Sequence, residues 1–353
     1  MIEQAFGRSP AWSVGVEEEL MLLDEVTHEP VAAAARVLQN GADGVKAELF
    51  TTVVETTTGI CTGPREAATE LVALRKRAAD LAYREGLVIA AAGTHPFAHP
   101  EDQPITDAPV YLDFVRAAGS AARRQGVQGL HVHVGMPDGE TCVRAHENAL
   151  PWLPVVLAIS ANSPWFRGKD TGFFSKRAEV LATLSRSGMP PPFASYAEWE
   201  AMFERWIAAG LLEKPTQTWW DARVHPALGT LELRAPDQPT DPAIASGLVA
   251  LLHALAVWAA QADGAPASRA DYQTNRFHAA RFGPRAELMH GDRLVPVPEL
   301  YHELLELVRP DPELIAPLQP TSCEAEWQLA KGDPARACAE IVQRSLASPD
   351  RDG

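Results

Sequence analysis

Cysteine is scarce in this chain of 353 residues, and its four copies are widely scattered. None of them forms a CxxC pair, so no structural zinc site is expected. Isolated cysteines of this kind are typical of reduced thiols, and they predict a cytoplasmic protein. The four positions are Cys61, Cys142, Cys323 and Cys338.

Long apolar runs are also absent. No segment approaches the roughly 20 uninterrupted apolar residues that a membrane-spanning helix needs. The N-terminal sequence MIEQAFGRSPAW lacks the basic and apolar regions of a signal peptide. The most apolar segment, 244–260, is interrupted by Ser246 and His253 and is expected to be a core helix. Because 46% of the residues are hydrophobic, the chain can bury a large core.

Positive charge is in deficit, with 31 Lys and Arg residues against 46 Asp and Glu residues. The formal net charge of -15 repels nucleic acids and anionic membranes, so neither is expected as a partner. It does not exclude an anionic nucleotide that arrives with bound magnesium.

Internal repeats, a GxSxG motif and a P-loop are missing as well. The predicted strands and helices alternate irregularly, which favours an α+β fold with a largely antiparallel sheet. One domain is expected over residues 1–353, mostly helical from about residue 241, with a turn at Gly291-Asp292. Strands are predicted at 12–23, 47–57, 87–92, 129–136, 216–224 and 229–235, and helices at 64–84, 110–124, 140–161, 196–209 and 241–262. Pro151 and Pro154 are expected to disturb the helix over 140–161.

The first predicted strand carries three consecutive glutamates in the sequence GVEEEL. Side chains of a strand alternate between two faces. The apolar residues of this strand therefore share one face with Glu18, while Glu17 and Glu19 point to the other face. A solvated polar face would explain this segment equally well.

Three other strands repeat the pattern with charged or titratable residues on the face opposite the apolar ones. Solvated faces are usually rich in Lys, Thr, Ser and Gln, whereas these strands carry Glu, His and Arg between glycines and apolar residues. The residues concerned are Glu55, His131, His133, Glu232 and Arg234.

If these strands are neighbours, four carboxylates and a histidine crowd onto one surface. Carboxylates that lie so near to one another raise one another's pKa and cost folding free energy unless a cation lies among them. Magnesium suits such oxygen-rich sites and shares its ligand shell with substrate phosphates. The pattern thus favours a metal–phosphate centre, in which Arg234 neutralises phosphate or holds a substrate carboxylate.

Seven motifs follow one another over most of the chain. They are SVGVEEELMLLD (13–24), VETTTGIC (54–61), GLHVHVGMPD (129–138), SANSPWFRGKDTGFFSKR (160–177), GMPPPF (188–193), TWWDARVHPALGTLELRAPDQPT (218–240) and TNRFHAARFG (274–283). Each motif alone is weak, but the ordered set is specific. With this set the chain resembles the bacterial type 2 glutamate–cysteine ligases, a carboxylate–amine ligase family of the glutamine-synthetase-like superfamily.

The resemblance implies an antiparallel sheet curled into a half-open barrel, with helices on its outer face and ATP with two or more Mg²⁺ ions on its concave face. The metal-facing residues implied by the matched motifs are Glu17, Glu19, Glu55, His131 and Glu232. Glu55, Arg234 and Arg177 are the expected catalytic residues.

Other positions rest on the resemblance more heavily. Nucleotide contacts are expected from Arg167, Lys176, Arg177, Arg234, Asn275 and Arg276. Ordinary surface residues would explain the basic loop that also holds Lys169, and a structural role would explain Asn275 and Arg276. Trp219, Trp220 and Asp221 are expected in a pocket wall or in the core, and His133 is expected to support the metal site or bind substrate.

The implied activity is an ATP- and Mg²⁺-dependent ligase that forms an amide through an acyl phosphate. Its small-molecule substrates would be a carboxylate, plausibly the γ-carboxylate of glutamate, and cysteine or another amine. A homo-oligomer is expected, with a dimer favoured. Two alternatives stay open: a metallohydrolase that uses His131 and His133, and a non-catalytic nucleotide-binding relative.

Overall fold

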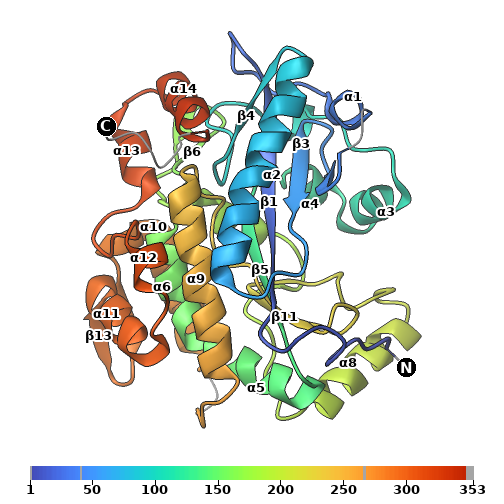
Figure 1. Ribbon diagram of the computed structural model, residues 1–353, viewed down its shortest axis with the longest axis vertical. Coiled ribbons are helices and arrows are strands. Elements are labelled where there is room, and N and C mark those ends of the chain that lie inside the picture. Colours follow the sequence, from blue (N-terminus) through green and yellow to red (C-terminus); the bar gives the residue numbers. More distant parts are fainter. Residues whose placement is uncertain (1, 40–41, 265–267, 347–353) are drawn as a thin grey trace.

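The computed structural model describes residues 2–39, 42–264 and 268–346 and contains a seven-stranded sheet surrounded by helices (Figure 1). Every strand pair in this sheet is antiparallel, which confirms the predicted α+β class. In order across the sheet the strands are β10 (Ala222–His225), β11 (Thr230–Leu233), β5 (Leu130–Gly135), β1 (Val14–Asp24), β3 (Val53–Thr57) and β2 (Val45–Ala47), with β4 (Leu87–Ala90) also paired to β1.

The long strand β1 is the centre of the sheet, because it pairs with β3, β4 and β5. Its apolar side chains, including Val16 and Leu20, are buried on one face, as the alternation predicts. Within the described residues β10 and β2 form the two edges, so no closed barrel is found. The half-open barrel therefore stays a prediction.

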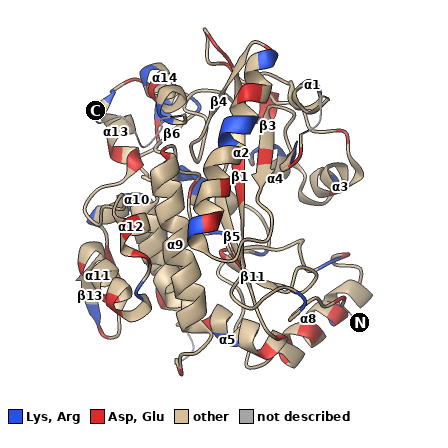
Figure 2. Cartoon of the chain, viewed as in Figure 1, with Lys and Arg blue, Asp and Glu red and all other residues tan. Residues whose placement is uncertain are grey.

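Two long helices, α2 (Pro64–Arg84) and α9 (Pro242–Ala259), lie side by side across this apolar face (Figure 1). A third helix, α5 (Gly139–Ala149), packs against α9. Helix α9 has no charged residue and is uniformly tan in Figure 2. It is long and apolar enough to cross a membrane, but most of it is buried against other elements, which confirms the predicted core helix.

The middle one of the three consecutive glutamates in β1 explains how α2 is held on the sheet. Glu18 is buried on the apolar side and forms an ion pair with Arg75 of α2, which is equally buried. Arg75 Nε donates to Glu18 Oε2 at 3.1 Å, and Arg75 Nη1 donates to the Thr240 carbonyl oxygen at 2.6 Å. Gln238 Nε2 adds a donor to Glu18 at 2.7 Å. One guanidinium thus connects β1, α2 and the segment that follows β11.

Two elements that the sequence predicts as continuous are each divided in two in the structure. The strand predicted over 47–57 is two strands, because the chain turns between Ala47 and Val53 and buries both Leu49 and Phe50. The helix predicted over 110–124 is divided into α3 (Pro109–Ala118) and α4 (Ser120–Arg123) at Gly119, whose φ is 59°.

The predicted disturbance of the 140–161 helix by its prolines is confirmed, because a short 3₁₀ turn, η2 (Leu150–Trp152), separates α5 from α6 (Leu153–Ile159). Another expectation needs correction. The C-terminal part is not purely helical, because β12 (Glu287–His290) and β13 (Arg293–Pro296) form a hairpin. Its two-residue loop is Gly291-Asp292, where the sequence predicted a turn.

Short elements and C-terminal helices complete the fold. Glu324 accepts hydrogen bonds from the backbone nitrogens of Thr240 and Asp241, so the C-terminal helices fasten the segment after β11. These elements are α1 (Ala34–Leu38), η1 (Pro100–Asp102), β6 (Trp165–Phe166), β7 (Lys169–Asp170), α7 (Lys176–Leu181), β8 (Ser187–Gly188), α8 (Tyr196–Ala208), β9 (Trp219–Trp220), α10 (Arg269–Phe282), η3 (Gly283–Arg285), α11 (Val297–Val308), α12 (Pro312–Ile315), α13 (Glu324–Ala330) and α14 (Pro334–Arg344).

Replacing Arg75 with Ala should destabilise the protein strongly, because it leaves the Glu18 carboxylate buried and unpaired. We expect a loss of about 3–5 kcal/mol in the free energy of unfolding, measured by urea denaturation. The neighbouring exposed residue offers a matched control, and Lys76→Ala should change this free energy by less than about 0.5 kcal/mol. Equal, small effects of the two substitutions would refute the role assigned to the ion pair.

Candidate metal and phosphate site

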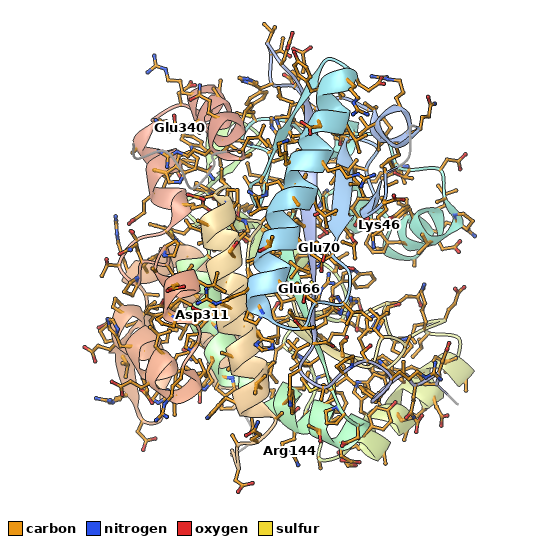
Figure 3. All side chains as sticks on the ribbon, viewed as in Figure 1. Lys46, Glu66, Glu70, Arg144, Asp311 and Glu340 are labelled. Atoms are coloured by element: carbon orange, nitrogen blue, oxygen red, sulfur yellow. The ribbon has the colours of Figure 1, made fainter. Side chains whose placement is uncertain are left out.

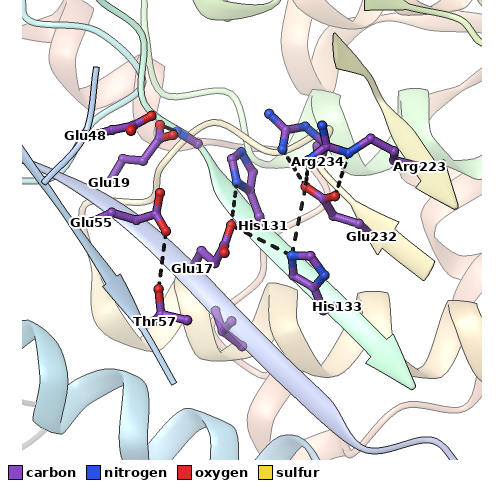
Figure 4. A network of polar contacts seen from close by, with 12 residues as sticks. Glu17, Glu19, Glu48, Glu55, Thr57, His131, His133, Arg223, Glu232 and Arg234 are labelled. Carbon is purple, nitrogen blue, oxygen red and sulfur yellow. Dashed lines mark hydrogen bonds and ion pairs between the residues drawn. The ribbon is translucent and has the colours of Figure 1, made fainter. Parts of the chain in front are cut away.

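The antiparallel register brings the predicted site residues of different strands directly opposite one another. Glu19 of β1 pairs with Glu55 of β3, and Glu17 pairs with His131 of β5. On the next strand pair, Glu232 of β11 lies opposite His133 of β5. These side chains lie on the face of the sheet opposite α2 and α9. Contacts join Glu17, His131, His133 and Glu232 into a polar network, and Glu19 and Glu55 lie beside it (Figure 4).

The first donor group consists of Glu17, His133 and Glu232, whose ligand atoms all lie within 4.8 Å of one another. His133 Nε2 is 3.8 Å from Glu17 Oε2 and 4.0 Å from Glu232 Oε1. This nitrogen is buried and makes no hydrogen bond within the described residues, although Nδ1 lies 3.1 Å from Thr230 Oγ1. A cation between His133 Nε2, Glu17 Oε2 and Glu232 Oε1 would give all three atoms a ligand-bond partner.

His131 lies beside this first group. Its Nδ1 is 3.4 Å from Glu17 Oε2, and burial lowers the pKa of the ring to about 3, so the imidazole is neutral. The sequence prediction names His131 as the metal ligand, whereas the atoms closest together belong to His133. Burial raises the pKa of Glu17, but the two histidine rings outweigh it and hold the pKa far below its usual range. Their nearest nitrogens lie 3.4 and 3.8 Å from Glu17 Oε2.

The second donor group consists of Glu19, Glu48 and Glu55, again with ligand atoms within 4.8 Å. Burial and the charge of Glu48 raise the pKa of Glu19 to about 8. Burial raises the pKa of Glu55 well above its usual value, and Glu17 and Glu48 add to this shift. Lys46, labelled in Figure 3, offsets part of this charge, since its Nζ lies 2.7 Å from Glu55 Oε1.

Glu48 belongs to this group although the sequence analysis missed it. If residues 47–57 formed one strand, Glu48 and Glu55 would lie on opposite faces, because their separation of seven is odd. The turn between β2 and β3 breaks that alternation and returns Glu48 to the same side as Glu55. The signal that could have revealed it is the pair Leu49-Phe50, two adjacent large apolar residues that do not fit an alternating strand.

Two arginines hold Glu232 in its ionised form. Arg223 donates from Nε and Nη2 to the two carboxylate oxygens at 2.7 Å each, and Arg234 adds an ion pair. Burial raises the pKa of Glu232, but these charges outweigh it and hold the pKa well below the usual range. Arg223 was not predicted, although the hairpin register that places it opposite Glu232 could have identified it.

Arg177 also reaches this face. Its guanidinium is buried and donates to the carbonyl oxygens of Arg234 and Ala235 at 3.1 and 3.3 Å. A Cβ at Gly129 would lie 2.1 Å from Arg177 Nη2, so any other residue there would displace this guanidinium. The backbone nitrogen of Gly129 in turn donates to Glu19 Oε2 at 2.7 Å. Arg177 therefore lies at the Glu19 end of the network.

The remaining predicted nucleotide contacts have partners outside both donor groups. Arg167 is paired with Glu101, and Lys176 with Glu179. Lys169 is exposed on β7. The Asn275 amide makes two hydrogen bonds to the Met289 backbone, which anchor β12. Arg276 Nε donates to Asp221 Oδ2 at 2.6 Å in a buried pair. Their contact with a nucleotide stays a prediction.

A cavity of about 900 Å³ opens next to the second donor group. Glu19, Glu48 and Arg234 lie in its wall, together with residues of α3 and of the loop that follows α8. Trp219 lines this cavity, as expected of a pocket wall, whereas Trp220 is buried in the core. The site thus combines an oxygen-rich donor face with an adjoining space large enough for a small-molecule substrate.

The donor chemistry fits magnesium. Five of the six side chains in the two donor groups are carboxylates, which are the hard oxygen ligands that Mg²⁺ prefers. Catalytic zinc or iron sites normally have more nitrogen ligands than the single histidine found here. Two groups side by side, with arginines at one end, can hold cations and a phosphate chain together.

Comparison with known proteins identifies similar sequences over nearly the whole chain. The model of the glutamate–cysteine ligase family 2 matches residues 13–314. A Rubrobacter xylanophilus protein provisionally named glutamate–cysteine ligase 2-3 is 40% identical over 335 residues, or 93% of this chain and 90% of the relative. A second, provisionally named glutamate–cysteine ligase 2-1, is 35% identical over 98% of this chain and 93% of the relative.

Solved structures share the fold at low sequence identity. The glutamate–cysteine ligase of Francisella tularensis, solved in complex with AMP, has a TM-score of 0.63 and 11% identity over 99% of this chain and 91% of its own. A bifunctional glutathione synthetase of Pasteurella multocida has a TM-score of 0.65 and 16% identity over 96% of this chain, which spans 50% of that structure. Helices around an antiparallel sheet are thus common to all three.

Replacing Glu48 with Gln should weaken cation binding, because it removes one of three carboxylates from the second donor group. We expect the affinity for Mn²⁺, measured by calorimetry without nucleotide, to fall about tenfold or more. In EDTA the unfolding temperature should not fall, because the substitution relieves repulsion. Glu306→Gln, an exposed substitution on α11, is the control. Unchanged Mn²⁺ affinity in the Glu48 variant would remove this residue from the site.

Proposed function

The chain belongs to the glutamate–cysteine ligase family 2 and is an ATP-dependent carbon–nitrogen ligase, and we propose that it joins the γ-carboxylate of glutamate to an amine through an acyl phosphate. The observation that carries this proposal is the pair of donor groups on one sheet face. Their carboxylates suit the magnesium ions that accompany ATP, and the adjoining arginines suit phosphate or a substrate carboxylate.

In the first step, an oxygen of the substrate carboxylate attacks the γ-phosphorus of ATP, and ADP leaves with the electrons of the broken P–O bond. Magnesium held by Glu17, His133 and Glu232 and by the second donor group would offset the negative charge of the phosphates. Arg234 and Arg177 lie at the same end of the face and would orient the carboxylate and the transferred phosphoryl group.

In the second step, the amine nitrogen attacks the carbonyl carbon of the acyl phosphate. A C–N bond forms, the C–O bond to phosphate breaks, and phosphate leaves with the electron pair. The amine nitrogen loses a proton as the C–N bond forms, and a carboxylate near the site would accept it. Burial raises the pKa values of Glu55 and Glu19 on this face. The chain needs no nucleophilic serine or cysteine for this chemistry, because positioning and electrostatics supply most of it.

The family name points to cysteine as the amine, and the sequence leaves other amines open. Cytoplasmic localisation and a homodimer also belong to the proposal, since a ligase of this kind uses cytoplasmic ATP and small-molecule substrates. Light scattering on the purified protein tests the dimer directly. A single mass equal to one chain of 38.2 kDa would refute it.

Glu17→Gln and Glu232→Gln should each abolish ligase turnover, because each removes a charged donor from the first group. With ATP, Mg²⁺, glutamate and hydroxylamine, which traps an acyl phosphate as a hydroxamate, we expect hydroxamate formation to fall about 100-fold or more. ADP release should fall in parallel.

Glu25→Gln is the matched control, since Glu25 directly follows β1 and is exposed. It should keep wild-type hydroxamate formation, and circular dichroism should show the same fold in all three variants. If both site variants retain near-normal activity, the donor groups are not the reaction centre. If the wild-type protein forms no hydroxamate from glutamate or any other carboxylate, the proposed reaction itself is wrong.

A further inference from the structure

The cavity beside the second donor group has walls that are mostly apolar and partly aromatic. Helix α3 contributes Val110 and Phe114, α7 contributes Leu181, and the loop after α8 contributes Leu211. The ring of Phe114 lies against the ring of Trp219, with centroids 4.9 Å apart. Such a wall is larger than the side chain of cysteine can cover.

Two of these side chains remain open to solvent. Val110 is 52% exposed and Leu211 is 62% exposed, although both line the cavity. Covering apolar surface of this kind stabilises a complex by about 25 cal/mol per Å². A ligand with a large apolar group gains this free energy, whereas a thiol gains little of it.

Two glutamines of the cavity wall, Gln125 and Gln128, have side-chain oxygens that are buried away from the cavity space. Gln125 Nε2 lies within hydrogen-bond distance of Ala121 O, Val180 O and Thr183 Oγ1, at 3.1, 3.3 and 3.2 Å. These acceptors identify the nitrogen end of the amide, so Oε1 is the end without a partner, and it is buried. Gln128 Oε1 is likewise buried without a hydrogen bond within the described residues.

Charge is distributed unevenly around the same space. Glu19 and Glu48 lie in the wall that is shared with the donor face, so an amino group at this wall would lie beside the proposed reaction centre. Arg186 and Lys214 also line the cavity and suit a carboxylate on the same ligand. Basic side chains and an apolar wall beside the donor face together match an α-amino acid with a large side chain.

We propose that this cavity binds the amine substrate and that this substrate is an α-amino acid with an aromatic or large aliphatic side chain, rather than cysteine. The inference rests on the proposed ligase reaction and specifies its second substrate. Phe114 and Leu211 pack against the side chain of this substrate, and Arg186 and Lys214 pair with its carboxylate. The nucleophile is its amino nitrogen, which displaces phosphate from the acyl phosphate.

The test is a comparison of amines with the purified full chain, ATP, Mg²⁺ and glutamate. The panel is glycine, cysteine, leucine, phenylalanine, tryptophan and phenethylamine, with product masses and kcat/KM as the readouts. We expect kcat/KM for at least one of leucine, phenylalanine and tryptophan to exceed that for cysteine about tenfold or more. Phenethylamine, which lacks the carboxylate, should be poorer than phenylalanine.

Two variants test the cavity itself. Phe114→Ala should lower kcat/KM for the best large amino acid about tenfold or more, with little change in KM for ATP. Leu211→Trp, at an exposed position in the cavity mouth, should impair the large amino acid more than glycine. Leu112→Ala is the matched control, because Leu112 is on the same helix but does not line the cavity.

The outcomes separate this inference from the proposed reaction. Hydroxamate formation with hydroxylamine, combined with cysteine as the best amino acid, would overturn the inference and keep the ligase. A rise in KM for ATP in the Phe114 variant, with an unchanged KM for the amino acid, would assign the cavity to the adenine ring instead. If no hydroxamate forms with any carboxylate, both proposals are wrong.

Discussion

The buried ion pair between Glu18 and Arg75 determines the orientation of the central strand. Because strand residues alternate, placing Glu18 inside directs Glu17 and Glu19 to the opposite face. Arg75 also donates to the carbonyl oxygens of Pro239 and Thr240, which follow β11. The guanidinium of Arg75 therefore fixes β1, which carries Glu17 and Glu19, relative to β11, which carries Glu232. A shift of one residue along β1 would bury Glu17 or Glu19 without a partner. This would cost much more free energy than burying Glu18 beside Arg75.

Alternation and order along the chain were enough to predict the polar face, since Glu17, Glu19, Glu55, His131 and Glu232 all lie on regular strands. Alternation does not predict where the chain turns back on itself. Glu48 belongs to the second donor group only because the chain turns before β3. The C-terminal hairpin lies in a segment predicted as helical, although Gly291-Asp292 indicates a tight turn. The sequence also could not predict the hydrogen-bond and ion-pair partners of Asn275 and Arg276, because these partners depend on tertiary contacts.

The two donor groups differ in how their negative charge is compensated. In the first group, Arg223 and Arg234 stabilise Glu232 as a carboxylate even without a cation. In the second group, Lys46 is the nearby ion-pair partner among the described residues, and the pKa values of Glu19 and Glu55 rise. The first group therefore keeps its charge without a cation, whereas a cation would favour the ionised carboxylates of the second group. Such a division suits a site in which one ion stays and another arrives with the nucleotide.

Tyr111 connects the second donor group to the helix that borders the cavity. Its hydroxyl lies 2.8 Å from Glu48 Oε2 and 2.9 Å from the Ala47 carbonyl oxygen, and its own helix, α3, carries Val110 and Phe114. An occupant that shifts α3 therefore also shifts a carboxylate of the metal group. If the proposed cation and cavity ligand both bind, thermodynamic linkage requires each to change the affinity of the other by the same factor. The Tyr111 hydroxyl would then be the physical link between them.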